Sequence, residues 1–481
     1  MHIIGWNLSI LQAILSVIAF ALLLYTDLLP HKYLIAVGAI LVLLLVVPRL
    51  LMKWKIKNVR WWFGSVITVA LCGVLIFTSS SLYTLANTLY KISGVSEKTV
   101  EVSVFVRADD TAETINDTAD YEYGIMETVA REDADETIDL IEEELDSTLT
   151  VTTYEGLLDV ADALLSGACD AIIFSSDYVD VIAELDDYDG FDDEVKELTA
   201  YSWVEEVVLE EDDEDEEDHT FIMYMSGIDT TGSVNVQSRS DVNILAVVNT
   251  ETKQVLLLST PRDYYVELSI SNGAMDKLTH AGLYGVEVSV ETLEMLYDTD
   301  IEYYFRINFT GFEDLIDALG GITVYSEYSF TATKGGYYYS VGWNTLNGAQ
   351  ALSFARERKA FSSGDIQRGK NQMAVIEAVI DKALSTSILT NFSSIMASVE
   401  DCFTTNMEYD TISALVKQQL ADGAEWNIQT YSVSGTGSSK STYSAGKAYV
   451  MLPDEETVET AKTYINMVLN GETLVVEEDE D

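Results

Sequence analysis

Cysteine, histidine and proline are scarce in this chain of 481 residues, which holds 3 Cys, 4 His and 4 Pro. So few cysteines exclude a disulfide framework as the basis of the fold. Cys72 lies inside an apolar run, and the sequence leaves open whether Cys169 and Cys402 pair. No Cys/His cluster has the spacing of a metal site, and no Gly-x-Ser-x-Gly motif or placed Cys/His pair indicates a protein nucleophile.

Basic residues are also scarce. Lys and Arg together number 27 against 80 Asp and Glu, which gives a formal net charge of −53. Such acidity argues against a nucleic-acid partner, because phosphate backbones are bound by basic surfaces. The charge is uneven, since the first 100 residues carry +6 and the remainder carries −59. Arginines that gather in the acidic remainder therefore indicate a site that needs positive charge.

Three apolar runs fill the start of the chain, at Leu8–Leu29, Tyr33–Val47 and Trp61–Leu82. Each is near the ~20 residues that a membrane-spanning helix needs. The first run has no basic segment before it and no small-residue cleavage site, so we do not interpret it as a signal peptide. The sequence predicts a three-span membrane anchor over residues 1–90.

The loop between the second and third runs predicts the orientation of the anchor. It is basic from Arg49 to Arg60, and the positive-inside rule places such a loop in the cytoplasm. The N-terminus is then cytoplasmic as well, whereas everything after Tyr83 is extracellular. We therefore expect a multi-pass protein of the cell membrane with its domains on the extracellular side.

Residues 98–203 predict a smaller α/β domain. Strands are expected at 100–106, 148–154 and 170–175, with helices at 122–130, 135–144 and 155–166. No glycine-rich phosphate loop follows any of these strands, so we interpret the region as an accessory domain that is dispensable for chemistry. A ligand-binding or glycan-sensing role is the alternative. An acidic linker over residues 204–219 separates this domain from the next.

Residues 220–386 predict the catalytic domain. Three apolar strands, near 221–225, 242–248 and 255–258, carry charged residues at their ends: Asp229, Arg239, Asp241 and Arg262. Open α/β sheets bind ligands at such edges. Asp229 and Asp241 suit Mg²⁺ or Mn²⁺, which takes one or two carboxylates together with substrate phosphates. The alternative is that each aspartate only forms a turn.

The densest basic stretch beyond residue 100 runs from Leu352 to Gln372 and holds Arg356, Arg358 and Arg368. A short helix is expected over 348–355, after which the chain extends so that Arg356 and Arg358 share a face. A long helix over 365–384 places Arg368 and Gln372 one turn apart. Guanidinium groups suit two-point binding of phosphate. A solvated helix end with ordinary salt bridges is the alternative.

The rest of the chain alternates between helices and strands. A helix over 276–297, a strand over 301–308, a helix over 312–319 and a strand over 322–325 are expected inside the catalytic domain. Residues 387–481 form a C-terminal extension with helices at 409–420 and 455–469, strands at 426–433 and 448–452, a Gly/Ser/Thr-rich loop between these strands, and a free acidic tail.

The motifs Gly-Ile-Asp, Arg-Ser-Asp and Pro-Arg-Asp precede LNGAQALSFARER and GDIQRGKNQ in this order. Over about residues 221–386 the pattern resembles the LytR-CpsA-Psr family of cell-envelope proteins. The resemblance implies a mixed β-sheet flanked by helices, with an apolar pocket for a lipid tail. It also implies transfer of a glycopolymer phosphate from a polyprenyl-pyrophosphate carrier to the cell wall, with teichoic acid or capsular polysaccharide as the polymer.

By this resemblance, Asp229 and Asp241 correspond to the metal-binding aspartates. The residues around the pyrophosphate correspond to Arg239, Arg262, Arg356, Arg358, Arg368 and Gln372, with Arg239, Asp241 and Arg262 at the catalytic centre. Two positions depart from the family pattern: Asn371 stands in place of an arginine, and Thr279 in place of an asparagine. The expected partners are a polyprenyl-pyrophosphate-linked glycan, the peptidoglycan acceptor and membrane lipid.

Two alternatives to a transferase stay open. The same site could hydrolyse the polyprenyl pyrophosphate with water as the acceptor. The family's older attenuator names imply a non-enzymatic membrane regulator, although the short inter-span loop and N-terminus are the only cytoplasmic segments expected here.

Overall fold

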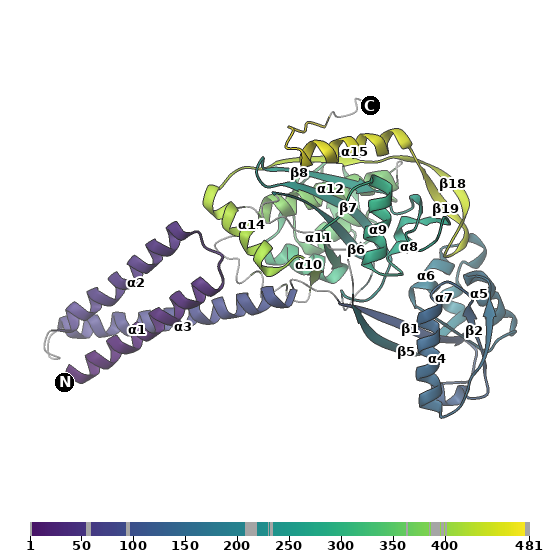
Figure 1. Ribbon diagram of the computed structural model, residues 1–481, viewed down its shortest axis with the longest axis horizontal. Helices are drawn as coiled ribbons and strands as arrows, with labels where there is room; N and C mark the ends of the chain where they lie inside the picture. Colours follow the sequence, from purple (N-terminus) through teal and green to yellow (C-terminus); the bar gives the residue numbers. More distant parts are fainter. Residues whose placement is uncertain are drawn as a thin grey trace.

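Figure 1 shows the computed structural model as a helical anchor at one end, a central sheet, and a second sheet unit at the other end. The structure describes residues 2–53, 59–92, 97–206, 219–228, 230, 234–361, 364–383, 385, 395, 399 and 402–476. Asp229, most of the acidic linker and the end of the acidic tail lie outside the described residues.

Three helices form the anchor: α1 (His2–Tyr25), α2 (His31–Met52) and α3 (Val59–Ile92). Their segments Ile4–Tyr25, His31–Met52 and Val59–Asn87 are long and apolar enough to cross a membrane. Both α1 and α2 pack against α3. The three apolar helices predicted from the sequence are confirmed, whereas their orientation in a membrane remains a prediction.

The turn between α1 and α2 contacts α14 (Tyr409–Asp422), which belongs to the folded region. The Tyr409 hydroxyl donates to the Thr26 carbonyl at 2.5 Å, and Lys417 Nζ lies 2.5 Å from Asp27 Oδ2. The Tyr90 ring of α3 stacks on Tyr409 with 4.4 Å between ring centroids. This turn therefore lies on the same side of the anchor as the folded region, as the predicted topology requires.

Residues 97–206 form a five-stranded unit with the strand order β3-β2-β4-β1-β5. Its strands are β1 (Glu97–Arg107), β2 (Glu122–Met126), β3 (Thr150–Tyr154), β4 (Ala171–Phe174) and β5 (Val195–Glu206). Its helical segments are η1 (Ile115–Thr118), α4 (Arg131–Leu145), α5 (Leu157–Ser166), α6 (Asp177–Ala183), η2 (Asp186–Tyr188) and α7 (Phe191–Glu194).

The prediction of a helix over 122–130 is wrong, because residues 122–126 form β2. This strand lies between β3 and β4 and is buried along nearly all its length, so it lacks the alternation that marks a half-exposed strand. Gly124 allows close packing, since a Cβ there would meet Cys169 Sγ at 3.0 Å. Strand β5 was not predicted.

The central sheet has six strands in the order β16-β11-β6-β7-β8-β17. Parallel pairs β11/β6 and β8/β17 flank the antiparallel pairs β6/β7 and β7/β8, so the sheet is mixed, as predicted. The strands are β6 (Thr220–Ile228), β7 (Ser240–Asn249), β8 (Gln254–Thr260), β11 (Tyr303–Asn308), β16 (Phe403–Thr405) and β17 (Asn427–Ser432).

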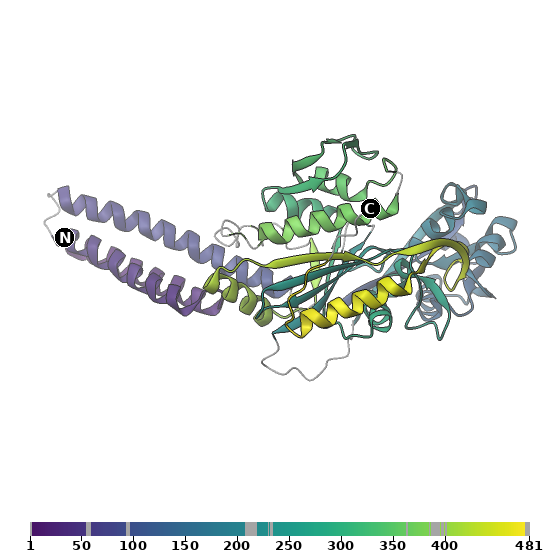
Figure 2. The same cartoon turned by 90° about the horizontal axis from the view of Figure 1, so that it is seen from above.

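Helices cover both faces of the central sheet (Figure 2). On one face, α8 (Leu278–Ala281), α9 (Val286–Tyr297) and α15 (Glu455–Leu469) pack against inward residues such as Tyr224 and Leu256. On the other, α12 (Asp365–Ala383) packs Met373 and Ile376 against Ile244 and Leu257. The helix predicted over 276–297 is in fact two helices, with Gly282–Gly285 between them.

A smaller layer lies over α12. It contains α10 (Phe309–Ala318), β12 (Ile322–Ser326), β13 (Phe330–Thr331), β14 (Tyr338–Tyr339), β15 (Gly342–Leu346) and α11 (Gly348–Arg356). Helix α11 approaches α10 closely, since a Cβ on Gly348 would meet the Glu313 carbonyl at 2.2 Å. The layer buries its own core around Phe354 and Ile316, which fixes α11 and α10 relative to α12.

Segments beyond residue 387 contribute to the central sheet itself, since β16 and β17 form its two edges. The prediction that the Gly/Ser/Thr-rich stretch is a loop is wrong. Gly435–Thr442 forms β18, which pairs with β19 (Gly446–Pro453). The side chains of β18 are mostly exposed and polar, so the sequence lacks the alternation of apolar residues that predicts a strand. A last small sheet pairs β9 (Tyr265–Glu267) with β10 (Met275–Lys277). Cys169 and Cys402 are buried and form no disulfide.

Candidate active site

A cavity with a volume of about 360 Å³ lies between the central sheet, α10, α11 and α12. Its walls divide into an apolar part and a charged part. The apolar part is lined by Met225, Phe305, Ile307, Phe309, Phe312, Leu315, Val375, Ile376, Val379 and Ile380. The resemblance implies an apolar pocket for a lipid tail, and this part of the cavity is apolar as such a pocket would be.

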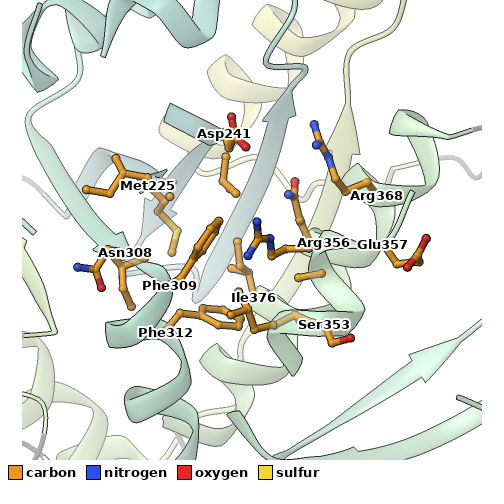
Figure 3. Close-up of a pocket in the computed structure, with 18 of the residues that line it drawn as sticks. Met225, Asp241, Asn308, Phe309, Phe312, Ser353, Arg356, Glu357, Arg368 and Ile376 are labelled. Carbon is orange, nitrogen blue, oxygen red and sulfur yellow. The ribbon is translucent and has the colours of Figure 1, made fainter. Parts of the chain in front are cut away.

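The apolar wall follows from the periodicity of its elements. Val375, Ile376, Val379 and Ile380 recur at three- and four-residue spacing, so they share one face of α12. Phe305 and Ile307 alternate along β11 and point to one face of the sheet. Figure 3 shows Phe309, Phe312, Met225 and Ile376 gathered around the same space.

The charged part of the cavity gathers six of the predicted site residues: Asp241, Arg262, Arg356, Arg358, Arg368 and Gln372. Asp241 lies at the start of β7 and Arg262 just beyond the end of β8. Because these strands are antiparallel neighbours, both residues lie at the same edge of the sheet. Arg262 Nη1 donates to Asp241 Oδ1 at 2.8 Å.

Arg356 is positioned by the end of α11. The helix starts at a capping box between Asn347 and Gln350 and ends at Glu357, whose extended backbone takes the chain away from the helix. The Arg356 guanidinium lies over the Phe309 ring, 3.8 Å from its centroid. The Glu357 carboxylate points away from it (Figure 3) and accepts from the Thr333 and Ala360 amides.

Arg368 and Gln372 lie one turn apart on α12, as predicted. Arg368 is buried and approaches Asp241 at the charged end of the cavity (Figure 3). Burial raises the pKa of Asp241, but the charges of Arg262 and Arg368 outweigh that effect and hold the pKa below its ordinary value. Asp241 is therefore ionised at neutral pH and accepts protons poorly.

Arg239 does not line the cavity, unlike the other predicted arginines in this part of the structure. Its side chain is buried and lies behind the cavity wall. Nη1 donates to Glu184 Oε1 at 2.9 Å, and Nη2 lies 3.5 Å from Asp180 Oδ2. Burial lowers the pKa of Arg239, but neighbouring carboxylates, with Glu184 foremost, outweigh that effect and raise it.

Glu184 lines the cavity and was missed by the sequence analysis, which placed residues 98–203 outside the site. It directly follows α6 of the five-stranded unit. One signal could have found it: Asp177, Asp180 and Glu184 recur at three- and four-residue spacing, which gives α6 an acidic face. Lys334, Ser353 and Asn308 also line the cavity and were not predicted.

The two departures from the family pattern are both buried. Asn371 Nδ2 donates to the Phe354 carbonyl at 3.2 Å and so joins α12 to α11. The Thr279 amide donates to the Arg262 carbonyl at 2.9 Å, which supports the backbone of that arginine. Nearby, His280 Nδ1 lies 2.7 Å from Oδ1 of buried Asp276, a contact that gives this histidine a structural role.

Two aspartates were predicted to bind a metal ion. Asp241 is among the described residues, whereas Asp229 lies outside them. No group of three or more His, Cys, Asp or Glu that could hold a metal occurs in the described ranges. A Mg²⁺ ion needs one or two carboxylates and completes its octahedron with water and phosphate oxygens. The ionised Asp241 at the cavity edge fits that requirement.

We next compared the sequence of this chain with models of known protein families. The model of the LytR_cpsA_psr family matches residues 190–466, which is more than half of the chain. The chain belongs to the LytR-CpsA-Psr family. The match covers the central sheet, the cavity except for Glu184, and most of α15, and it confirms the resemblance drawn from the sequence motifs.

Relatives of this LytR-CpsA-Psr protein carry the name polyisoprenyl-teichoic acid–peptidoglycan teichoic acid transferase TagU. The protein from Oceanobacillus iheyensis is 36% identical over 225 residues, which are 45% of this chain and 67% of the relative. The protein from Bacillus subtilis strain 168 is 35% identical over 202 residues, 42% of this chain and 64% of its own. This chain thus spans about two thirds of each relative's length.

Among solved structures, TagV of B. subtilis is 27% identical to this LytR-CpsA-Psr chain, with a TM-score of 0.46. The alignment covers 54% of this chain and 100% of TagV. TagU of B. subtilis is 29% identical, with a TM-score of 0.41, over 54% of this chain and 99% of TagU.

Proposed function

We propose that this protein transfers a glycopolymer phosphate from a polyprenyl-pyrophosphate carrier to peptidoglycan. One observation carries the proposal: a single cavity joins an apolar slot to an end lined by four arginines. A prenyl pyrophosphate has an apolar chain and a charged head that match these two parts of the cavity. Burial of the chain in the apolar slot is favourable, and guanidinium groups bind the phosphates. The names of the relatives support teichoic acid as the polymer, and capsular polysaccharide is the alternative.

In the proposed reaction, an acceptor hydroxyl of peptidoglycan attacks the sugar-side phosphorus. The bond from that phosphorus to the bridging oxygen breaks, polyprenyl phosphate leaves with the electron pair, and the hydroxyl proton passes to the released phosphate or to water. Such transfers depend mainly on positioning and charge stabilisation, so no protein nucleophile is required. Arg262, Arg356 and Arg368 would offset the negative charge of the transition state within a strongly acidic protein.

Asp241 serves this mechanism as an ion-binding group. Its lowered pKa and its hydrogen bond from Arg262 make Asp241 a weak acceptor for the hydroxyl proton. We assign Asp241, together with Asp229, to a Mg²⁺ or Mn²⁺ ion. The ion would supply further charge neutralisation at the phosphates.

We also propose that the protein acts on the outer side of the cell membrane, as a multi-pass protein. The basic segment from Arg49 to Arg60 supports this orientation. The contact between α14 and the α1–α2 turn supports the three-span arrangement, because the turn and the catalytic region then lie on one side of the membrane, but the side itself rests on the basic segment.

The test is a turnover assay with the full chain in detergent. Its donor is a polyprenyl-pyrophosphate-linked oligosaccharide, its acceptor is peptidoglycan, and Mg²⁺ is added or chelated. We expect release of polyprenyl phosphate together with labelled peptidoglycan, and loss of both products without the ion. Equal release when peptidoglycan is omitted would indicate the hydrolase, and no release under any condition would favour the non-enzymatic regulator.

A further inference from the structure

Glu184 connects two arginines that the sequence motifs place at the catalytic centre. Its Oε1 accepts from Arg239 Nη1 at 2.9 Å and lies 3.7 Å from Arg262 Nη2. Arg262 in turn donates to Asp241 at 2.8 Å, and Asp180 lies 3.5 Å from Arg239. Carboxylates and guanidiniums therefore alternate in an unbroken chain from α6 to the edge of the central sheet.

The accessibility of these groups differs along the chain. The side chains of Arg239 and Arg262 are 6% and 11% exposed, whereas the Glu184 side chain is 41% exposed and lines the cavity. Burial raises the pKa of Glu184, but the charges of Arg239, Arg262 and Lys277 outweigh that effect and lower it. The carboxylate is thus ionised in the pH range where phosphates bind.

Helix α6, which Glu184 directly follows, is held by an apolar interface. Tyr178, Val181 and Ile182 are buried in one cluster together with Leu283 and Ala445 of the region around the central sheet. These side chains lie on the face of α6 adjacent to its acidic face. Packing of this kind fixes the position of α6, so Glu184 is presented to the arginines by a rigid element.

The same interface is reinforced by polar contacts between the first strand and the catalytic region. The Thr99 amide donates to the Asn235 carbonyl at 2.9 Å, and the Gln237 amide donates to the Thr99 carbonyl at 3.1 Å. Lys98 Nζ lies 2.5 Å from Glu287 Oε1. The five-stranded unit is therefore attached both to the segment just before Arg239 and to α9.

We propose that Glu184 is a positioning residue, by which the five-stranded unit sets the orientation of the Arg239 and Arg262 guanidiniums for the transfer reaction. This inference rests on the proposed function. Two unconstrained arginine side chains sample many rotamers, and a carboxylate between them removes that freedom before the substrate arrives. Arg262 can then direct its remaining donors at the phosphates without a reorganisation step.

The opposite role would be competition, in which the Glu184 carboxylate occupies the place of a substrate phosphate. The two roles predict different kinetics. A positioning residue acts mainly on kcat, because misplacement of a catalytic group by about 1 Å costs on the order of 10² in rate. A competitor acts on substrate binding, so its removal would lower KM and tighten the binding of a prenyl pyrophosphate.

The experiment compares the full chain with the variants Glu184→Gln, Glu184→Asp and Glu136→Gln. Glu136 is an exposed acid of α4 in the same unit and lines no part of the cavity, so it is the matched control for lost charge. For each protein, kcat and KM for the polyprenyl-pyrophosphate donor are measured with peptidoglycan as the acceptor. Binding of farnesyl pyrophosphate and the thermal unfolding midpoint are measured separately.

For Glu184→Gln we expect kcat to fall on the order of 10²-fold, while KM and farnesyl pyrophosphate binding stay within about threefold. Glu184→Asp should recover part of kcat because it keeps the charge, and Glu136→Gln should match the wild type. A purely structural role would instead lower the unfolding midpoint and reduce the active fraction, and Glu184→Asp would give no selective recovery of kcat.

Three results would overturn the inference alone: wild-type kinetics in Glu184→Gln, tighter farnesyl pyrophosphate binding with a lower KM, or equal kcat in the Gln and Asp variants. A wild-type protein that releases no polyprenyl phosphate would overturn the proposed function, which the inference requires. The two failures are therefore separated by the wild-type assay.

Discussion

Arg262 and Asp241 form an ion pair, with 2.8 Å between Nη1 and Oδ1, at the edge where β7 starts and β8 ends. Both side chains are largely buried, at 11% and 15% exposure. Removal of one partner leaves the other charge in a poorly solvated place, which is more costly than removal of both. Substitutions at this pair should therefore affect stability as well as catalysis.

Arg262→Ala should lose turnover on the order of 10³-fold, by analogy with other arginines that stabilise phosphoryl transfer. It should also lower the thermal unfolding midpoint, because Asp241 and Glu184 lose their shared counter-charge. Arg262→Ala combined with Asp241→Ala should regain part of the midpoint but none of the activity. Activity in the double variant close to that of the wild type would contradict the assignment of both residues to the site.

Asp241 should give the protein a stability that depends on pH. Its pKa in the folded state is below the ordinary value of 3.8, so its contribution is present above that value and is lost as the pH falls through the folded pKa. The unfolding midpoints of wild type and Asp241→Asn should differ at pH 7 and converge below about pH 4. A difference that stays constant down to strong acid would show that Asp241 is not held by these charges.

The apolar slot should select for the length of a prenyl chain. Ile376→Trp fills space between α12 and the sheet, and each 50 Å² of lost apolar contact costs roughly 1.3 kcal/mol, or about a tenfold loss in affinity. Binding of undecaprenyl pyrophosphate should weaken by about tenfold or more, whereas inorganic pyrophosphate should bind as before. Asp381→Trp on the exposed side of α12 is the control. Equal binding of the long chain by both variants would place the lipid elsewhere.

The predicted membrane topology can be tested on intact protoplasts. Protease added outside should digest the catalytic region and leave a fragment that ends near Tyr83. Detection uses one epitope tag at the N-terminus and another at the C-terminus, with lysed protoplasts as the control. Protection of residues 98–476 in intact protoplasts would reverse the orientation assigned from the basic loop.

The parts of the fold that follow from local pattern could be predicted. The apolar spacing of α12 locates its buried face, and the charged ends of β7 and β8 locate Asp241 and Arg262 at one sheet edge. Strand β2 of the five-stranded unit could not be predicted. It is buried on both faces, so its sequence lacks the alternation of apolar and polar residues. Strand β18 could not be predicted either, since it is a polar strand of Gly, Ser and Thr.

The role of Glu184 could not be predicted for a different reason. The acidic face of α6 is visible in the sequence, but its partner Arg239 lies 55 residues further along the chain. No periodicity indicates which surface α6 meets, because that depends on how the five-stranded unit packs against Leu283 and Ala445. The prediction that residues 98–203 are dispensable for chemistry rested on the absence of a glycine-rich phosphate loop, and the proposed role of Glu184 beside Arg239 and Arg262 argues against it.

The contact between α14 and the anchor has a mechanical consequence. Tyr409 is hydrogen-bonded to Thr26 and stacked on Tyr90, so one side chain of the catalytic region contacts both the α1–α2 turn and α3. These contacts restrict how far the catalytic region can swing about its connection to the anchor. In the proposed orientation, they favour one height of the cavity above the bilayer, to which the carrier lipid would rise.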